Sequence, residues 1–343
     1  MNLAWKEIKK NKVRFTILGS IVFLVSFLTF IISGLANGLS QDNAALIKNL
    51  PEGYFYMEEE ADESFNLSLI PATIQESILD EHENAMALSI QMGFLNDSAE
   101  KQHSVAFVMS TPTELFVDVA QGEVFLDSSL KDKIKVGDTL SNIQLKGSLT
   151  VKGFIEQEKY SHAPVAFINE QDFKEMYRTE EMQLLFLADK DHAPTIDGLQ
   201  SFTKEEFLKT IPSYSAEQLS LNMIVWFLLV ISGMLFAIFF YMMNVQKIGL
   251  YGILKAIGVK TSALFKMMWV QMLFITMTAL ALSMTFSQIF GLVTPDTMPF
   301  NLPLWSTIQL SITFLVIGFI GATLSGLQIK KVQPLQAIQQ GEG

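Results

Sequence analysis

Four long stretches of the chain contain no Asp, Glu, Lys or Arg, and they limit the possible folds more than any other feature. They cover residues 15–41, 218–246, 267–295 and 297–329. About 20 helical residues cross the roughly 30 Å hydrocarbon core of a bilayer, so each stretch is long enough to span it. One such stretch could be a buried helix of a soluble protein. Four of them predict a polytopic α-helical membrane protein with four transmembrane helices.

The four stretches are unevenly spaced, in a 1+3 arrangement, because residues 42–217 separate the first from the other three. This interval has ordinary polar content and the length of a domain. Runs of β-branched and aromatic residues predict strands at 105–109, 123–126, 149–155 and 164–168. Short helices are expected at 73–80 and at 171–178, the second with Asn169 as its cap. An α+β domain is therefore predicted, in which the acidic, weakly patterned residues 51–66 form a mobile segment.

Charged residues are distributed in a way that predicts the topology. Residues 1–14, 247–266 and 330–343 hold 11 Lys and Arg, whereas residues 42–217 hold 13 Lys and Arg against 32 Asp and Glu. Short basic segments stay in the cytoplasm. Both termini and the 247–266 loop are therefore expected to be cytoplasmic, and the domain between the first two helices extracellular. The acidity of that domain argues against nucleic acid as a partner.

The N-terminal region has two possible interpretations. A basic start followed by an apolar run also describes a signal peptide, but the run is about twice the usual 7–15 residues. The sequence Ser33-Gly34-Leu35-Ala36 is also a poor cleavage site. We therefore expect residues 15–41 to remain as a helix, preceded by a cytoplasmic amphipathic segment at 1–14 that lies on the lipid surface.

The loop at 247–266 has the pattern of a short amphipathic helix. Ile248, Tyr251, Leu254 and Ile257 recur at helical spacing, and Gly258 is expected to end the helix. Thr261 or Ser262 is expected to cap the next one. The second transmembrane helix is thus predicted to continue into the cytoplasm, stop at Gly258 and return as the third. An elbow of this kind is suited to dock another protein.

Several motifs resemble one known family. The segment 246–260 (QKIGLYGILKAIGVK) resembles the signature of FtsX-type ABC transporter permeases, which include the MacB-type exporters, and 331–338 (KVQPLQAI) is similar to their C-terminal motif. Residues 122–127 and 135–139 resemble the MacB-type core domain. Within the family, four segments are similar to the haem-exporting permeases of Gram-positive bacteria: 32–39, 160–163, 214–218 and 296–301.

The resemblance implies a homodimer bound to two cytoplasmic ATPase subunits. The chain itself has no G-x-x-x-x-G-K-[ST] phosphate loop, so a partner subunit is expected to bind ATP and the chain is not expected to be an enzyme. ATPase motion is expected to reach the helices through the elbow. The candidate coupling residues are Ile248, Gly249, Tyr251, Ile253, Leu254, Lys255 and Gly258.

A haem exporter needs apolar walls and one or two axial donors such as Tyr, His or Met. Carboxylates at the same height would hinder the return of the anionic propionates. Interfacial tyrosines also anchor helices, and a helical methionine is also an ordinary packing residue. The candidate substrate-binding residues are Tyr160 and His162 between two predicted strands, Tyr214 and Glu217 before the second transmembrane helix, and Met223 within it.

Other functions remain open at the level of sequence. The histidines lack metal-ligand spacing, and neither a catalytic nor a metal site is predicted. The apolar stretches hold no carboxylate of the kind a proton-coupled carrier uses. The alternatives to haem export are a permease for an antimicrobial peptide or a lipid, and an FtsX-like mechanical regulator of a cell-wall hydrolase.

Overall fold

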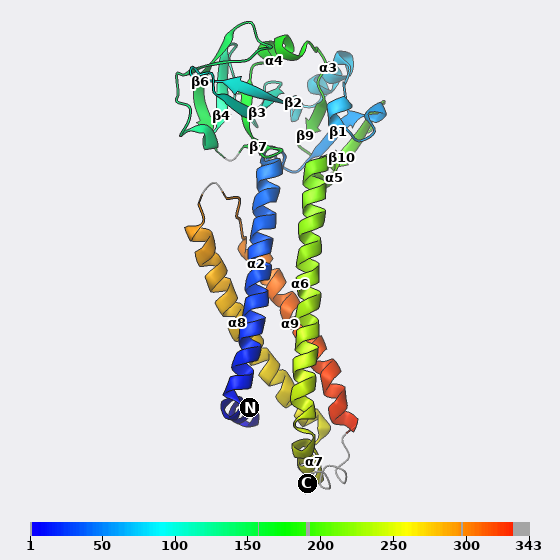
Figure 1. Ribbon diagram of the computed structural model, residues 1–343. Helices are drawn as coiled ribbons and strands as arrows, with labels where there is room; N and C mark the ends of the chain where they lie inside the picture. Colours follow the sequence, from blue (N-terminus) through cyan, green and yellow to red (C-terminus); the bar gives the residue numbers. More distant parts are fainter. Residues whose placement is uncertain (1, 157, 190–192, 296–297, 332–343) are drawn as a thin grey trace. The chain divides into compact units, whose positions relative to one another are not determined.

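The chain divides into two compact units in the computed structural model, which describes residues 2–156, 158–189, 193–295 and 298–331. One unit comprises Met1–Gly38 and Leu219–Gly343, and we call it the helical unit. The other comprises Leu39–Gln218, and we call it the sheet domain. Figure 1 labels the elements of both. The predicted cytoplasmic tail at 330–343 and the motif at 331–338 lie almost wholly outside the described residues.

Four helices of the described chain are long and apolar enough to cross a membrane, as predicted. They are α2 (Lys12–Lys48), α6 (Pro212–Val245), α8 (Thr261–Val293) and α9 (Leu304–Lys331). The last begins at Leu304 and not at residue 297 as expected. Pro299 and Pro303 account for this difference, because proline lacks a backbone N–H and disfavours the α conformation of the residue before it.

Two shorter helices complete the helical unit: α1 (Asn2–Lys10) and α7 (Ile248–Ala256). The predicted stop at Gly258 is confirmed, with φ +92°. The N–H of Gly258 donates to Lys255 O at 3.0 Å and that of Val259 to Leu254 O at 2.9 Å, which is a Schellman motif.

Two details of this region differ from the prediction. The second long helix does not continue into α7, because Gln246 and Lys247 separate the two helices. The predicted cap of α8 by Thr261 or Ser262 is wrong, since Lys260 occupies the N-cap position without a side-chain hydrogen bond.

The helices of this unit pack through small and polar residues. A Cβ atom on Gly321 would lie 3.0 Å from Gly233 O, so α6 and α9 approach each other closely. The hydroxyls of Ser26 and Ser283 hydrogen bond at 2.6 Å between α2 and α8. Hydroxyl pairs of this kind satisfy polar groups that lipid cannot.

The sheet domain contains a ten-stranded mixed sheet. Six of its strands, in the order β2-β3-β8-β4-β6-β5, close into a barrel because β5 pairs with β2 again through Ser141 and Asn96. Strands β9, β1 and β10 extend the sheet from β2, and β7 pairs with β8. The strands are β1 (Tyr54–Glu58), β2 (Ala85–Asn96), β3 (Gln102–Ser110), β4 (Glu123–Asp127), β5 (Thr139–Ser141), β6 (Ser148–Ile155), β7 (Lys159–Tyr160), β8 (Ala163–Ile168), β9 (Leu184–Leu187) and β10 (Leu199–Thr203).

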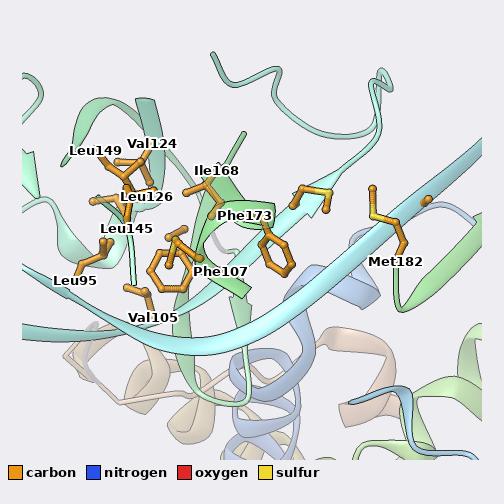
Figure 2. Packing of buried hydrophobic residues seen from close by; sticks show 14 of the residues in the cluster. Leu95, Val105, Phe107, Val124, Leu126, Leu145, Leu149, Ile168, Phe173 and Met182 are labelled. Atoms are coloured by element: carbon orange, nitrogen blue, oxygen red, sulfur yellow. The ribbon is translucent and has the colours of Figure 1, made fainter. Parts of the chain in front are cut away.

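Two apolar clusters fill this domain, one of them centred on the barrel. Figure 2 shows Val124, Leu126 and Leu149 of that cluster gathered together, with Phe107 between this group and Phe173 of α4. A Cβ atom on Gly93 would lie 2.8 Å from the Phe107 ring, so the strand needs glycine at this point. The helices of the domain are α3 (Ala72–Glu81), α4 (Glu170–Tyr177) and α5 (Lys204–Thr210).

The strands and helices expected from the sequence of this domain are present, with one error. Asn169 caps α4 as predicted, with its side chain accepting from Gln171 N at 2.9 Å. The expectation of a mobile segment at 51–66 is wrong, because β1 lies between β10 and β9 within the sheet. Phe55, Tyr56 and Met57 are all buried, and they fix this strand despite the acidic residues that follow it.

Candidate functional site

The β7–β8 hairpin brings one candidate substrate residue to the end of α2. Its two-residue turn consists of Ser161 and His162, both with positive φ (49° and 62°), as a type I′ turn requires. Ser161 N donates to Asn43 O at 2.7 Å. The next residue of α2, Ala44, departs from helical geometry with φ −142° and ψ 27°. The bend in the helix thus coincides with the contact to the hairpin.

His162 bridges the end of α2 and the start of α6. Its Nδ1 lies 3.4 Å from Asp42 Oδ2, and its Nε2 lies 3.0 Å from Glu217 Oε1. Asn43 Nδ2 also lies 3.2 Å from Nε2, so an amide donor and a carboxylate both face this ring nitrogen.

Neighbouring polar groups complete what we call the His162 network. Asn43 Nδ2 donates to Glu217 Oε2 at 3.1 Å, and Ser213 Oγ donates to Asn43 Oδ1 at 3.1 Å. Lys159 forms an ion pair with Asp42. The side chains of His162, Asp42 and Glu217 are 35%, 20% and 29% exposed, so a ligand can reach the network from solvent. Its members are Asp42, Asn43, Lys159, His162, Ser213 and Glu217.

Tyr214 lies beside this network, on the first turn of α6. Its hydroxyl accepts a hydrogen bond from Ser40 Oγ at 3.3 Å, and the Lys48 ammonium lies 5.7 Å from the centre of its ring. A cation over an aromatic face is attracted to the ring. The side chain is half-buried, so its hydroxyl already has a protein partner but is not sealed inside the core.

The two other candidate substrate residues have different environments. Tyr160 is 3% exposed and packs edge-to-face on Phe65, and burial raises the pKa of its hydroxyl. A contact between Tyr160 and substrate would require this part of the core to open. Met223 belongs to the helical unit and is 53% exposed on α6. The structure therefore brings together His162, Glu217 and Tyr214, whereas the roles of Tyr160 and Met223 stay predictions.

Asp42 and Asn43 are members of the network that were not predicted from the sequence. Asp42 is the first charged residue after the apolar stretch at 15–41, which was the available signal. Their link to His162 spans about 120 positions and depends on the fold. A local motif could not have identified it.

The helix α7 contains all of the predicted coupling residues except Gly258, and it presents an apolar stripe to its surroundings. Leu250, Ile253 and Ile257 are 49%, 52% and 72% exposed and lie on one face of the helix and its C-cap. We call these three residues the α7 stripe. Only Ile253 of the stripe was among the predicted coupling residues; Leu250 and Ile257 were not.

The other predicted coupling residues lie toward the helical unit or at the ends of α7. Tyr251 is 1% exposed, and its hydroxyl donates to Asn244 Oδ1 at 3.1 Å. Leu254 packs against the same apolar cluster, and Lys255 Nζ donates to the carbonyl of Ile329. Ile248 and Gly249 are half-buried, and Gly258 forms the turn that follows the helix. The inward residues hold α7 in place, whereas the side chains of the stripe are exposed.

Metal binding finds no support among the residues that the structure describes, since they contain no group of three or more His, Cys, Asp and Glu side chains arranged to hold an ion. His103, for example, is buried and paired with Asp97 at 3.0 Å. The side chains of His103 and His162 form ion pairs or hydrogen bonds with neighbouring residues.

Comparison with known proteins shows similarity along the whole chain. Residues 222–334 match the family described as FtsX-like permease C-terminal. A protein of Staphylococcus haemolyticus named as a hemin transport system permease, HrtB, is 31% identical over 98% of this chain and 99% of its own length. A Staphylococcus epidermidis protein of the same name is 28% identical over 100% of both chains.

One solved structure resembles part of the chain distantly. The periplasmic region of MacB from Actinobacillus actinomycetemcomitans aligns with 48% of this chain and 95% of its own length, at 11% identity and a TM-score of 0.35. Similarity at this level is too low to support an argument about the fold.

Proposed function

Because the chain belongs to the HrtB-type FtsX-like permeases of ABC transporters, we propose that it exports haem or a related flat amphiphile. The observation that carries this proposal is the end-to-end similarity to relatives named as hemin transport permeases. As a permease of this type, the chain works with an ATPase and is not itself the enzyme. The proposed complex is a homodimer of the permease with two ATPase subunits.

The proposed orientation follows from charge. The basic N-terminal segment, the α7 region and the C-terminal segment face the cytoplasm, and the acidic sheet domain lies outside the cell. Haem partitions into the bilayer, so an exporter of this build can take it from the membrane and release it outside. The basic loops also attract the anionic lipids of the inner leaflet.

The His162 network supplies the groups that such a substrate needs. In the proposed mechanism, the imidazole of His162 or the hydroxyl of Tyr214 ligates the iron, two donors of the kind found in haem proteins. Nε2 of His162 faces Glu217 and Asn43, so this nitrogen must turn away from both side chains before it can bind iron. The carboxylates of Asp42 and Glu217 would repel the propionates and oppose re-entry of the released substrate.

The α7 stripe is the proposed docking surface for the ATPase. Three exposed apolar side chains on a short helix fit a hydrophobic groove of a partner, a common mode of helix recognition. The buried contacts of Tyr251 and Leu254 connect this helix to the rest of the helical unit. Closure of the ATPase subunits on ATP would therefore move α7 together with the helices behind it.

The experiment that tests the function is growth in toxic haem of a strain lacking the permease, complemented with the permease and its ATPase. Restored growth with lower cell-associated haem is expected. His162→Gln and Tyr214→Phe together are expected to lower the tolerated haem concentration at least five-fold at unchanged membrane abundance. His103→Gln, which alters a histidine of the barrel, is the matched control and should leave haem tolerance near wild type.

Two other outcomes would redirect the proposal. If the complemented strain shows no haem phenotype but tolerates a cationic peptide or a membrane-active lipid, the substrate is of that class. If neither export phenotype appears and cell-wall hydrolysis changes instead, the protein is a mechanical regulator. Equal resistance in the wild type and the double variant would remove His162 and Tyr214 from the site while leaving haem export in place.

A further inference from the structure

The N-terminal helix α1 makes specific contacts with α8. The Trp5 ring packs edge-to-face on Phe274 of α8, with 5.0 Å between the ring centres. Gln271 Nε2, also on α8, donates to Glu7 Oε2 at 2.7 Å. A helix that only floated on the lipid surface would need neither a buried amide partner nor an aromatic contact of this kind.

Glu7 makes its second contact with the junction between α6 and α7. Its carboxylate forms an ion pair with Lys247, the residue that immediately precedes α7. The two side chains are only 12% and 9% exposed, and the Lys247 ammonium lies 5.8 Å from the centre of the Phe15 ring. The start of α2 contacts the same junction, because Arg14 donates to the side chain of Gln246.

A buried ion pair is better explained by specificity than by stability. Removing two charges from water costs about as much as their attraction returns, so apolar side chains of equal volume would hold α1 at least as firmly. Apolar side chains, however, could slide past one another. A single pair of opposite charges permits one arrangement of α1 and Lys247, because any other leaves a buried charge without its partner.

Lys247 lies between α6 and α7, so a contact to its side chain can control how α7 moves. Lys247 adopts φ −110° and ψ 7°, outside the helical geometry of its neighbours, so the backbone can pivot here between α6 and α7. Glu7 forms an ion pair with the side chain of Lys247, and Gln271 of α8 donates a hydrogen bond to the same carboxylate. One side chain thus connects three helices at the point where α7 begins.

We propose that the Glu7–Lys247 ion pair couples α1 to α7, so that α1, α7 and the adjoining end of α8 move as one body when the ATPase moves α7. Glu7 and Lys247 are positioning residues in this view, since the α7 stripe makes the contact with the ATPase. The proposal rests on the proposed function of the chain as an ATPase-driven permease. It adds the N-terminal helix to the coupling device.

The coupling can be measured in the purified permease–ATPase complex in lipid nanodiscs. The chain has no cysteine, so spin labels on Lys6→Cys and Ala256→Cys of one protomer, assembled with an unlabelled protomer and a cysteine-free ATPase, report the distance between α1 and α7. A single narrow distance distribution is expected both without nucleotide and with trapped ATP. Glu7→Gln should at least double the width of this distribution and lower haem export at least five-fold, with unchanged co-purification of the ATPase.

The charge-swapped variant Glu7→Lys with Lys247→Glu tests the pair itself. It should restore the narrow distribution and at least half of the export, whereas Glu7→Lys alone should not. Lys10→Gln, which removes an exposed charge from the same helix, is the matched control and should behave as wild type. A wild-type width in Glu7→Gln, or a swap that restores nothing, would overturn the proposal.

The two proposals can fail separately in this design. If the wild-type complex moves no haem, the proposed function fails, while the distance measurement still tests the ion pair in each nucleotide state. If the wild type exports haem and Glu7→Gln exports it equally well, the function stands and the coupling role of Glu7 is refuted.

Discussion

At the scale of the residue, Glu158 of the sheet domain has a carboxylate whose surroundings disfavour its charge. Burial raises the pKa of Glu158, the hydrogen bond from Asn49 lowers it, and the charge of Asp127 raises it again. Within the described residues its Oε2 has no hydrogen-bond partner, although Oε1 accepts from Asn49 at 3.2 Å. At neutral pH the folded protein therefore bears the cost of an ionised carboxylate that is partly desolvated.

Glu158→Gln is expected to stabilise the protein at neutral pH. An acid whose folded pKa is raised favours the folded state below its unfolded pKa of about 4.3, and this contribution is lost as the pH rises through the folded pKa. The gain of the variant should be about 1 kcal/mol at pH 7, or about 3 °C in midpoint, and should vanish near pH 4. Thermal unfolding of the purified full-length protein at both pH values measures it; an equal gain at pH 4 would contradict the explanation.

The candidate site shows what residue types alone can predict. Tyr214 and Glu217 were predicted because they stand just before a transmembrane stretch, and His162 because it lies between two strands. Local sequence is enough for such placements. It could not reveal that Asp42 and Asn43 contact His162, nor that Tyr160 of the same hairpin turns into the core. Both facts depend on which face of the hairpin meets α2.

At the scale of the element, one face of α7 packs against the helical unit and the other carries the exposed α7 stripe. Substitutions on the first face should affect membrane abundance, and substitutions on the second should affect ATPase binding. Ile253→Asp places a charge on the exposed stripe, so the protein is expected to insert and remain stable but to lose at least ten-fold in co-purification of the ATPase. Tyr251→Asp buries a charge beside Asn244 and should lower membrane abundance instead. Normal ATPase association of the Ile253 variant would remove the α7 stripe from the mechanism.

A second element-scale feature joins two motifs that the sequence presented separately. Gly34 and Gly38 of α2 pack against the segment before α9. A Cβ atom on Gly34 would lie 2.3 Å from the Phe300 ring, and a Cβ atom on Gly38 would lie 2.2 Å from Pro299 O. Asn301 N also donates to Gly34 O at 2.9 Å. The glycines at 34 and 38 have the G-x-x-x-G spacing of helix pairs, yet here they pack against a loop.

This packing predicts that one second-site substitution restores stability to a Gly34 variant but not to a Gly38 variant. Gly34→Ala and Gly38→Ala should each cost about 1–3 kcal/mol through overpacking. Phe300→Ala should rescue the first, because a side chain is what obstructs it, but not the second, which meets backbone. Thermal unfolding of the detergent-solubilised protein compares them, with Gly147→Ala as control since nothing lies within 4 Å of a Cβ at that position. Equal rescue of both glycine variants would show that the obstruction at Gly38 is not the backbone.

The elements that the sequence predicted well are those with a strong local pattern. The apolar stretches and the β-branched runs each contain their own signal. The strand β1 was not predicted, because the five acidic residues within 58–63 make the segment polar on average although Tyr54–Met57 is apolar. The barrel closure was also beyond prediction, since the pairing of β2 with β5 joins residues 45 positions apart through a single bridge.

At the scale of the whole molecule, the distribution of charge predicts the orientation in the membrane, and with it the direction of transport. All four apolar helices are consistent with either orientation, so the argument rests on the basic short segments and the acidic sheet domain. Exporting haem outward from a cytoplasmic ATPase requires the α7 stripe and the His162 network to be on opposite sides. An inverted molecule could not meet its ATPase.

Single cysteines introduced into the cysteine-free chain can determine this orientation directly. Ile143, 92% exposed in the sheet domain, and Ala256, exposed on α7, are suitable positions. A membrane-impermeant maleimide should label Ile143→Cys in intact cells, and Ala256→Cys only after lysis. Labelling of Ala256→Cys in intact cells would invert the proposed topology. The α7 stripe could then not contact a cytoplasmic ATPase, and the outward direction of transport would fail with it.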